Sequence, residues 1–146
     1  MFLKIVILLA AIALFGCYSC KSPSLFPAKY RGEQIHFGQG GGFSGAVSYF
    51  ALMDDGRVFQ KGFRDSTFAL LDTWDKHFVS QMFSNYKVLG LDTVQYYEPG
   101  DLYYFIQYKS GSGPFHRIAW GKPGFKADQN VVTYYNLLFK STKSKS

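Results

Sequence analysis

Residues that cross-link a chain or bind a metal are scarce here. Cysteine occurs only at Cys17 and Cys20 among 146 residues. A C-x-x-C pair indicates a redox or metal site only beside a βαβ unit or a second pair, and the chain has neither. Asp72 and Asp75, with His77 nearby, would share one face of a helix, but they form no H-E-x-x-H motif. We therefore expect no metal ion, no disulfide framework and a domain held together by its own core.

Acidic residues are in the minority, with 10 Asp and Glu against 16 Lys and Arg and a formal charge of +6. The basic residues are scattered, apart from a basic tail at 141–146 that follows Lys140. Binding to nucleic acid usually requires a basic stripe or patch, so we expect no nucleic acid partner. The tail should stay solvated and add weak attraction to anionic lipid near a membrane.

The apolar run at the N-terminus is too short for a typical membrane span. It extends from Ile5 to Phe15 and follows a single charge at Lys4. A transmembrane helix needs about 20 predominantly apolar residues. One positive charge followed by about 7–15 apolar residues is typical of a secretory signal peptide, which we assign to residues 1–16.

The residues that follow this run resemble the lipobox of bacterial lipoproteins, with Gly16 directly before Cys17. In that family the cysteine is acylated and becomes the new N-terminus. The resemblance implies that Cys17 carries the lipid, with Cys20 as the alternative site. We expect residues 17–32 to be the anchor and tether, and the protein to lie in the cell envelope, on the periplasmic or surface side of a bacterial membrane.

Residues 33–140 should form an α+β domain, a small antiparallel sheet with two helices packed on one face. Asp55-Gly56 between two apolar runs indicates a hairpin. A three- and four-residue apolar spacing predicts a long helix that begins at Asp65 or Ser66 as N-cap. The expected strands are 33–37, 47–53, 57–59, 102–108 and 115–120, and the expected helices are 66–86 and 131–138.

Five of the eleven residues 37–47 are glycine, and Gly40, Gly42 and Gly45 spell the dinucleotide motif G-x-G-x-x-G. That motif binds a pyrophosphate only where a helix follows it directly, because the helix N-terminus meets the phosphate. Here an alternating strand segment follows instead. We therefore expect no nucleotide or other cofactor, and interpret the glycines as a bulge or tight bend in a strand.

The block Gly42–Ala46 also nearly spells a nucleophile elbow around Ser44. Such an elbow requires a strand-to-helix turn on a large sheet that carries His and Asp partners. His36 and His116 would approach Ser44 only if their strands lie next to it. With no complete catalytic constellation in the sequence, we expect that the protein is not an enzyme.

Phe43, within this block, is either a plug in the core or an exposed anchor for a partner. The block, the Asp-Gly hairpin, Tyr-Tyr-Phe-Ile and His-Arg-Ile-Ala-Trp resemble a family of small bacterial lipoproteins. Residues 41–45 are also similar to the opening of emfourin-like inhibitors of thermolysin-like metalloproteases. The resemblance implies a protease as one candidate partner, with another envelope protein as the other. The candidate contact loop is Gly41, Gly42, Phe43, Ser44 and Gly45.

Aromatic residues make up 19% of the chain, and most fall at helical or alternating spacing, which indicates core. Four tyrosines around a Pro-Gly turn are harder to bury together. They either cover the open face of the sheet or stay exposed as contacts for a protein or a sugar. These candidate exposed aromatics are Tyr96, Tyr97, Tyr103 and Tyr104.

Overall fold

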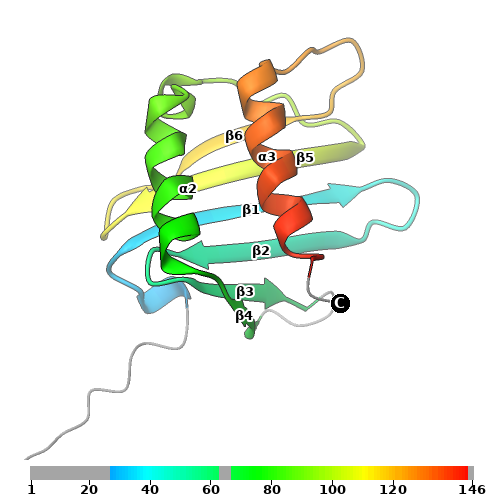
Figure 1. Ribbon diagram of the computed structural model, residues 1–146. Coiled ribbons are helices and arrows are strands. Elements are labelled where there is room, and N and C mark those ends of the chain that lie inside the picture. Colours follow the sequence, from blue (N-terminus) through cyan, green and yellow to red (C-terminus); the bar gives the residue numbers. More distant parts are fainter. Residues whose placement is uncertain (1–26, 63–66, 145–146) are drawn as a thin grey trace, which may run out of the picture.

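A computed structural model describes residues 27–62 and 67–144. Six antiparallel strands form one sheet in the order β4-β3-β2-β1-β5-β6, and both helices lie on the same side of it (Figure 1). The predicted α+β class is therefore confirmed. The strands are β1 (Glu33–Gly41), β2 (Val47–Met53), β3 (Arg57–Lys61), β4 (Phe68–Thr73), β5 (Leu102–Ser110) and β6 (His116–Trp120). The helices are α2 (Lys76–Val88) and α3 (Gln129–Ser141), with short 3-10 turns η1 (Pro27–Lys29) and η2 (Leu91–Thr93).

The main core lies between the sheet and the two helices. Alternation along β1 directs Ile35 and Phe37 toward the helices, where both are fully buried. They pair across strands with Leu52 on β2 and Ile106 on β5, which belong to the same cluster. We call the opposite side of the sheet, which the helices leave uncovered, the open face.

The helix predicted at 66–86 is wrong in its first half. Phe68–Thr73 pairs with β3 as the edge strand β4, and the helix begins only at Lys76. Asp75 is the N-cap, because its carboxylate accepts hydrogen bonds from two backbone N–H groups of the first turn. Asp72 is on β4 and shares no helix face with Asp75. The proposed caps Asp65 and Ser66 lie outside the described residues.

The first strand is longer than predicted, since β1 continues from Glu33 through Gly38 and Gly40 and ends at Gly41. The segment after the glycines is strand β2, which turns at Asp55-Gly56 into β3. This confirms the hairpin and removes the helix N-terminus that a phosphate loop would need.

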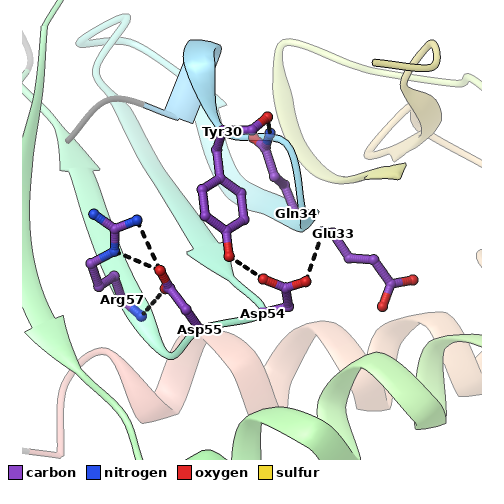
Figure 2. A network of polar contacts seen from close by, with 6 residues as sticks. All are labelled: Tyr30, Glu33, Gln34, Asp54, Asp55 and Arg57. Carbon is purple, nitrogen blue, oxygen red and sulfur yellow. Dashed lines mark hydrogen bonds and ion pairs between the residues drawn. The ribbon is translucent and has the colours of Figure 1, made fainter. Parts of the chain in front are cut away.

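The segment at 27–32, which we assigned to the tether, contacts the domain. Pro27 is buried, and the Tyr30 hydroxyl donates to Asp54, whose other oxygen accepts the Glu33 backbone N–H at 2.9 Å (Figure 2). Tyr30 also packs against a small cluster on the open face. The ordered fold therefore begins before β1.

Cys17, Cys20 and the apolar run before them lie outside the described residues. Within the described ranges no helix has both the length and the hydrophobicity to span a bilayer. The lipid anchor and the signal peptide remain expectations from the sequence.

Candidate binding site on the open face

Two glycines of β1 lie beneath aromatic rings on the open face. Gly38 is paired with Phe105 on β5, and Gly40 with Tyr103. A Cβ atom built on Gly40 would lie 2.6 Å from the Tyr103 hydroxyl oxygen, and one on Gly38 would lie 3.0 Å from Phe105 Cζ and 1.9 Å from the Ser48 carbonyl oxygen. The aromatic rings of β5 therefore lie against a strand surface that carries no side chains.

Beside these rings the open face has a hollow of about 460 Å³, a volume within the roughly 300–1,000 Å³ typical of small-molecule sites. Its walls are largely aromatic: the Tyr49 and Phe105 rings are 5.0 Å apart, and those of Tyr103 and Phe105 are 6.3 Å apart. Tyr97 enters from the loop before β5, which forms a parallel bridge with β6 at Ala119. We call this site the aromatic hollow. Its lining residues are Val47, Tyr49, Tyr97, Pro99, Gly100, Tyr103, Phe105, Gln107, Ile118 and Ala119.

A chain of buried polar groups leads to one wall of the aromatic hollow. The Gln34 side-chain nitrogen donates to the Tyr30 carbonyl at 3.2 Å, so its oxygen faces His36 Nε2 at 2.9 Å and accepts from it. His36 Nδ1 is then the acceptor for the Tyr49 hydroxyl, also at 2.9 Å. The Tyr49 hydroxyl has a second acceptor in reach, Gln107 Oε1 at 3.5 Å, but its single proton goes to the nearer His36 Nδ1. In this order of donors the Tyr49 oxygen keeps its lone pairs as acceptors.

Electrostatics keep both His36 and Tyr49 neutral at neutral pH. Burial, with a smaller contribution from Lys109, lowers the pKa of His36 from 6.5 to about 4. Burial likewise raises the pKa of Tyr49. The imidazole is enclosed by the rings of Tyr49, Phe68 and Phe115, with its centroid 4.8 Å from that of Phe115. An imidazole with so low a pKa is a weak general base, and a tyrosine with a raised pKa is a weak nucleophile.

Cations flank the aromatic hollow, although no lining residue is charged. Lys61 Nζ lies 5.8 Å from the centroid of the Tyr49 ring. Arg117 pairs in register with Gln107, is exposed, and its charge opposes the rise in the Tyr49 pKa. Neither cation forms an ion pair with an acidic side chain in the described ranges 27–62 and 67–144. The site therefore has a neutral interior and a positive rim on the side of Tyr49 and Gln107, where Lys61 and Arg117 lie.

The glycine block forms the tip of the β1–β2 hairpin, and Phe43 there is fully exposed, with a relative accessibility of 113%. Phe43 is therefore not a core plug, which leaves the exposed alternative. Gly42 N–H donates to the Asp101 carbonyl at 2.7 Å, and Gly45 N–H to the Gly42 carbonyl at 3.1 Å, so the loop is held at its base. Ser44 accepts a bond from the Ala46 backbone N–H.

The two strand histidines lie on opposite faces of the sheet. His36 is bonded to Tyr49 and Gln34 on the open face. His116 lies on the helix side, where Nε2 donates to the Val94 carbonyl at 2.7 Å and Nδ1 accepts from Tyr86 at 2.5 Å. These bonds engage both ring nitrogens of each histidine, so the structure does not bring together the two histidines considered as partners of Ser44.

Only one of the four candidate tyrosines is exposed. Tyr97 is 66% accessible. Tyr96 and Tyr104 pack against the helix-side core, and Tyr103 is half-buried in the aromatic hollow. The four tyrosines therefore do not follow one alternative together: Tyr97 is exposed and Tyr103 covers part of the open face, whereas strand alternation sends Tyr104 to the helix side.

Sequence reasoning missed the residues that build the hollow. Tyr49, Phe105 and Gln107 were not singled out, although their odd-numbered alternation marks one face of their strands. Their meeting depends on β1 lying between β2 and β5, which local patterns do not specify. Comparisons with protein-family models, curated proteins and solved structures gave no match.

Proposed function

We propose that this chain is a lipid-anchored cell-envelope protein whose α+β domain binds a ligand without catalysis. The observation that carries the binding role is the aromatic hollow, where ring faces converge with polar groups that have no hydrogen-bond partner among the described residues. The anchor rests on Gly16-Cys17 at the end of the apolar run. The membrane is thus a partner through the lipid, and the hollow provides the site for a second.

The protonation states around the hollow favour binding over chemistry. His36 is neutral and saturated with hydrogen bonds at both ring nitrogens. The Tyr49 hydroxyl donates its single proton to His36 and keeps lone pairs for an incoming donor. These groups are suited to orienting a ligand, whereas a general base needs a pKa near the working pH.

Metabolic labelling with radioactive palmitate in a bacterial host tests the anchor. The wild-type chain should incorporate label and fractionate with membranes, and a Cys17→Ala/Cys20→Ala double variant should do neither. The single variants identify the acylated residue, with Cys17→Ala expected to lose the label. An unlabelled wild-type chain, or full labelling of the double variant, contradicts the proposal.

A second candidate function is inhibition of a thermolysin-like metalloprotease through the Gly41–Gly45 loop. The observation in its favour is the fully exposed Phe43 ring at the tip of a loop held at its base. The purified chain should then slow peptide hydrolysis by thermolysin at stoichiometric concentration, and Phe43→Ala should relieve the inhibition. Unchanged hydrolysis across a panel of such proteases would rule this function out.

A further inference from the structure

We propose that the aromatic hollow binds an acidic sugar unit of an anionic glycan. This assignment rests on the binding role proposed above and names its ligand. The C–H face of a pyranose ring carries slight positive charge, and an aromatic face carries slight negative charge. Tyr97, which is 66% exposed at the mouth, and the Tyr103 and Phe105 rings offer such faces to a sugar.

Sugar hydroxyls need hydrogen-bond partners that are not already engaged. Within the described ranges, the hydroxyls of Tyr97 and Tyr103 and the side-chain nitrogen of Gln107 make no hydrogen bond to the protein. The Tyr49 oxygen retains acceptor capacity because its proton goes to His36. The hollow therefore offers donors and acceptors together, as a polyhydroxylated ligand requires.

The positive rim selects for a carboxylate on the sugar. The ten lining residues are uncharged, so the ring of the sugar would lie in a neutral environment. Lys61 and Arg117 lie beside Tyr49 and Gln107 without acidic partners among the described residues. An arginine guanidinium binds a carboxylate through two parallel hydrogen bonds, which adds direction to the attraction.

An extended acidic peptide suits this site less well. Peptides usually bind a sheet by adding a strand at an edge, where backbone groups are unpaired. The aromatic hollow is lined by residues of β2, β5 and β6 and of the loop before β5. Both β2 and β5 are paired on each side, and the Tyr97 segment bridges to β6 at its outer edge. The available contacts are ring faces and side-chain polar groups, which favours a glycan.

The test is an NMR titration of the full chain in a zwitterionic, sugar-free detergent. Tetragalacturonate is the acidic probe, maltotetraose the neutral one and a tetraglutamate peptide the acidic non-sugar. Tetragalacturonate should bind at least about tenfold more tightly than either, as expected when a hydrogen bond to a charged group is added. Binding should weaken when NaCl is raised, because salt screens exposed charges.

Two variants probe the two halves of the site. Tyr97→Ala should weaken tetragalacturonate binding about three- to tenfold by removing one ring face. Arg117→Gln should weaken it about tenfold and bring the acidic and neutral sugars closer together. The matched controls are Phe43→Ala, an exposed ring outside the hollow, and Lys76→Gln, an exposed cation on α2. Both controls should bind as the wild type does.

The proposal is overturned if tetragalacturonate does not bind, or if maltotetraose or tetraglutamate binds equally well. It is also overturned if Tyr97→Ala and Arg117→Gln leave the affinity unchanged in folded protein. The palmitate experiment reports separately on the anchor. Labelled protein that binds no glycan refutes this ligand alone, whereas unlabelled protein that binds glycan refutes the anchor alone.

Discussion

Acidification should destabilise the folded domain through His36. The pKa of this side chain is 6.5 in an unfolded chain and about 4 in the fold, because its charged form is disfavoured by burial. Between these values the unfolded chain binds more protons than the folded one. The free energy of unfolding must then decrease as the pH falls.

The magnitude follows from the same two values. Folding lowers the His36 pKa from 6.5 to about 4, and each pKa unit corresponds to about 1.36 kcal/mol. The free energy of unfolding should therefore decrease by about 3 kcal/mol in total once the pH is below about 4. By pH 5 the loss should be about 2 kcal/mol. The free energy of unfolding of a typical domain is about 5–15 kcal/mol, so a decrease of this size should be measurable.

The assay is equilibrium denaturation of the full chain in detergent at pH 7, 6 and 5. Fluorescence of the buried Trp74 and Trp120 reports unfolding. The hydrogen bond from Tyr108 is the chief cause that lowers the pKa of the Glu33 carboxyl from 4.5. Protonation of Glu33 therefore decreases the free energy of unfolding only when the pH falls below about 4.5. Measurements above pH 5 therefore isolate the histidine.

The controls separate His36 from other titrating groups. His36→Gln, which can still hydrogen-bond to its neighbours, should remove most of the dependence between pH 7 and 5. His77→Gln, at an exposed position on α2, should keep the wild-type dependence. A wild-type domain that loses less than about 0.5 kcal/mol by pH 5, or a His36→Gln variant as acid-sensitive as the wild type, would refute the reasoning.

The remaining predictions concern stability and are checked by the same denaturation assay at pH 7. Gly38→Ala should cost about 1–3 kcal/mol, because its Cβ would meet the Ser48 carbonyl oxygen at 1.9 Å. Asp75→Ala should cost about 1 kcal/mol through loss of the N-cap, and Asp75→Asn much less. Phe43→Ala should stay within about 0.5 kcal/mol of the wild type, since the ring is exposed. A neutral Gly38→Ala, equal losses in both Asp75 variants or a strongly destabilised Phe43→Ala would contradict these assignments.

Local patterns were sufficient for much of the fold. Alternation from Val47 to Asp54 predicted β2, which ends at Met53, and Asp55-Gly56 placed the hairpin because glycine adopts a positive φ there, 96° in the structure. The final helix was found from its apolar spacing, although it begins at Gln129 rather than Val131. These signals act within a few residues of each other, so no knowledge of the tertiary structure was needed.

The prediction of a long helix was wrong in its first half because the apolar spacing there was ambiguous. Leu71 and Trp74 have helical spacing with Phe78, yet Leu71 is on β4 and 43% exposed. Pairing of Phe68–Thr73 with β3 is a non-local interaction, and it outweighs a weak local preference. The Asp75 side chain is the local signal for the true helix start, but we expected it on a helix face shared with Asp72.

The aromatic hollow was beyond sequence reasoning for a related reason. It requires β1 to lie between β2 and β5, and the β1–β5 pairing joins residues about seventy positions apart, such as Gly38 and Phe105. Gly38 and Gly40 alternate along β1, and Tyr103 and Phe105 alternate along β5, so each pair is visible in the sequence. Only the order of the strands places these rings over these glycines.

This arrangement explains why glycine occupies alternate positions of a central strand. A glycine in a strand costs about 0.5–1 kcal/mol relative to alanine, so Gly38 and Gly40 require a structural reason. A turn does not supply one, because both lie within the ladder, paired on each side. The rings of Phe105 and Tyr103 supply it: they lie where side chains of β1 would otherwise project. The glycines that suggested a phosphate loop thus let the rings of β5 pack against the sheet, where these rings form walls of the aromatic hollow.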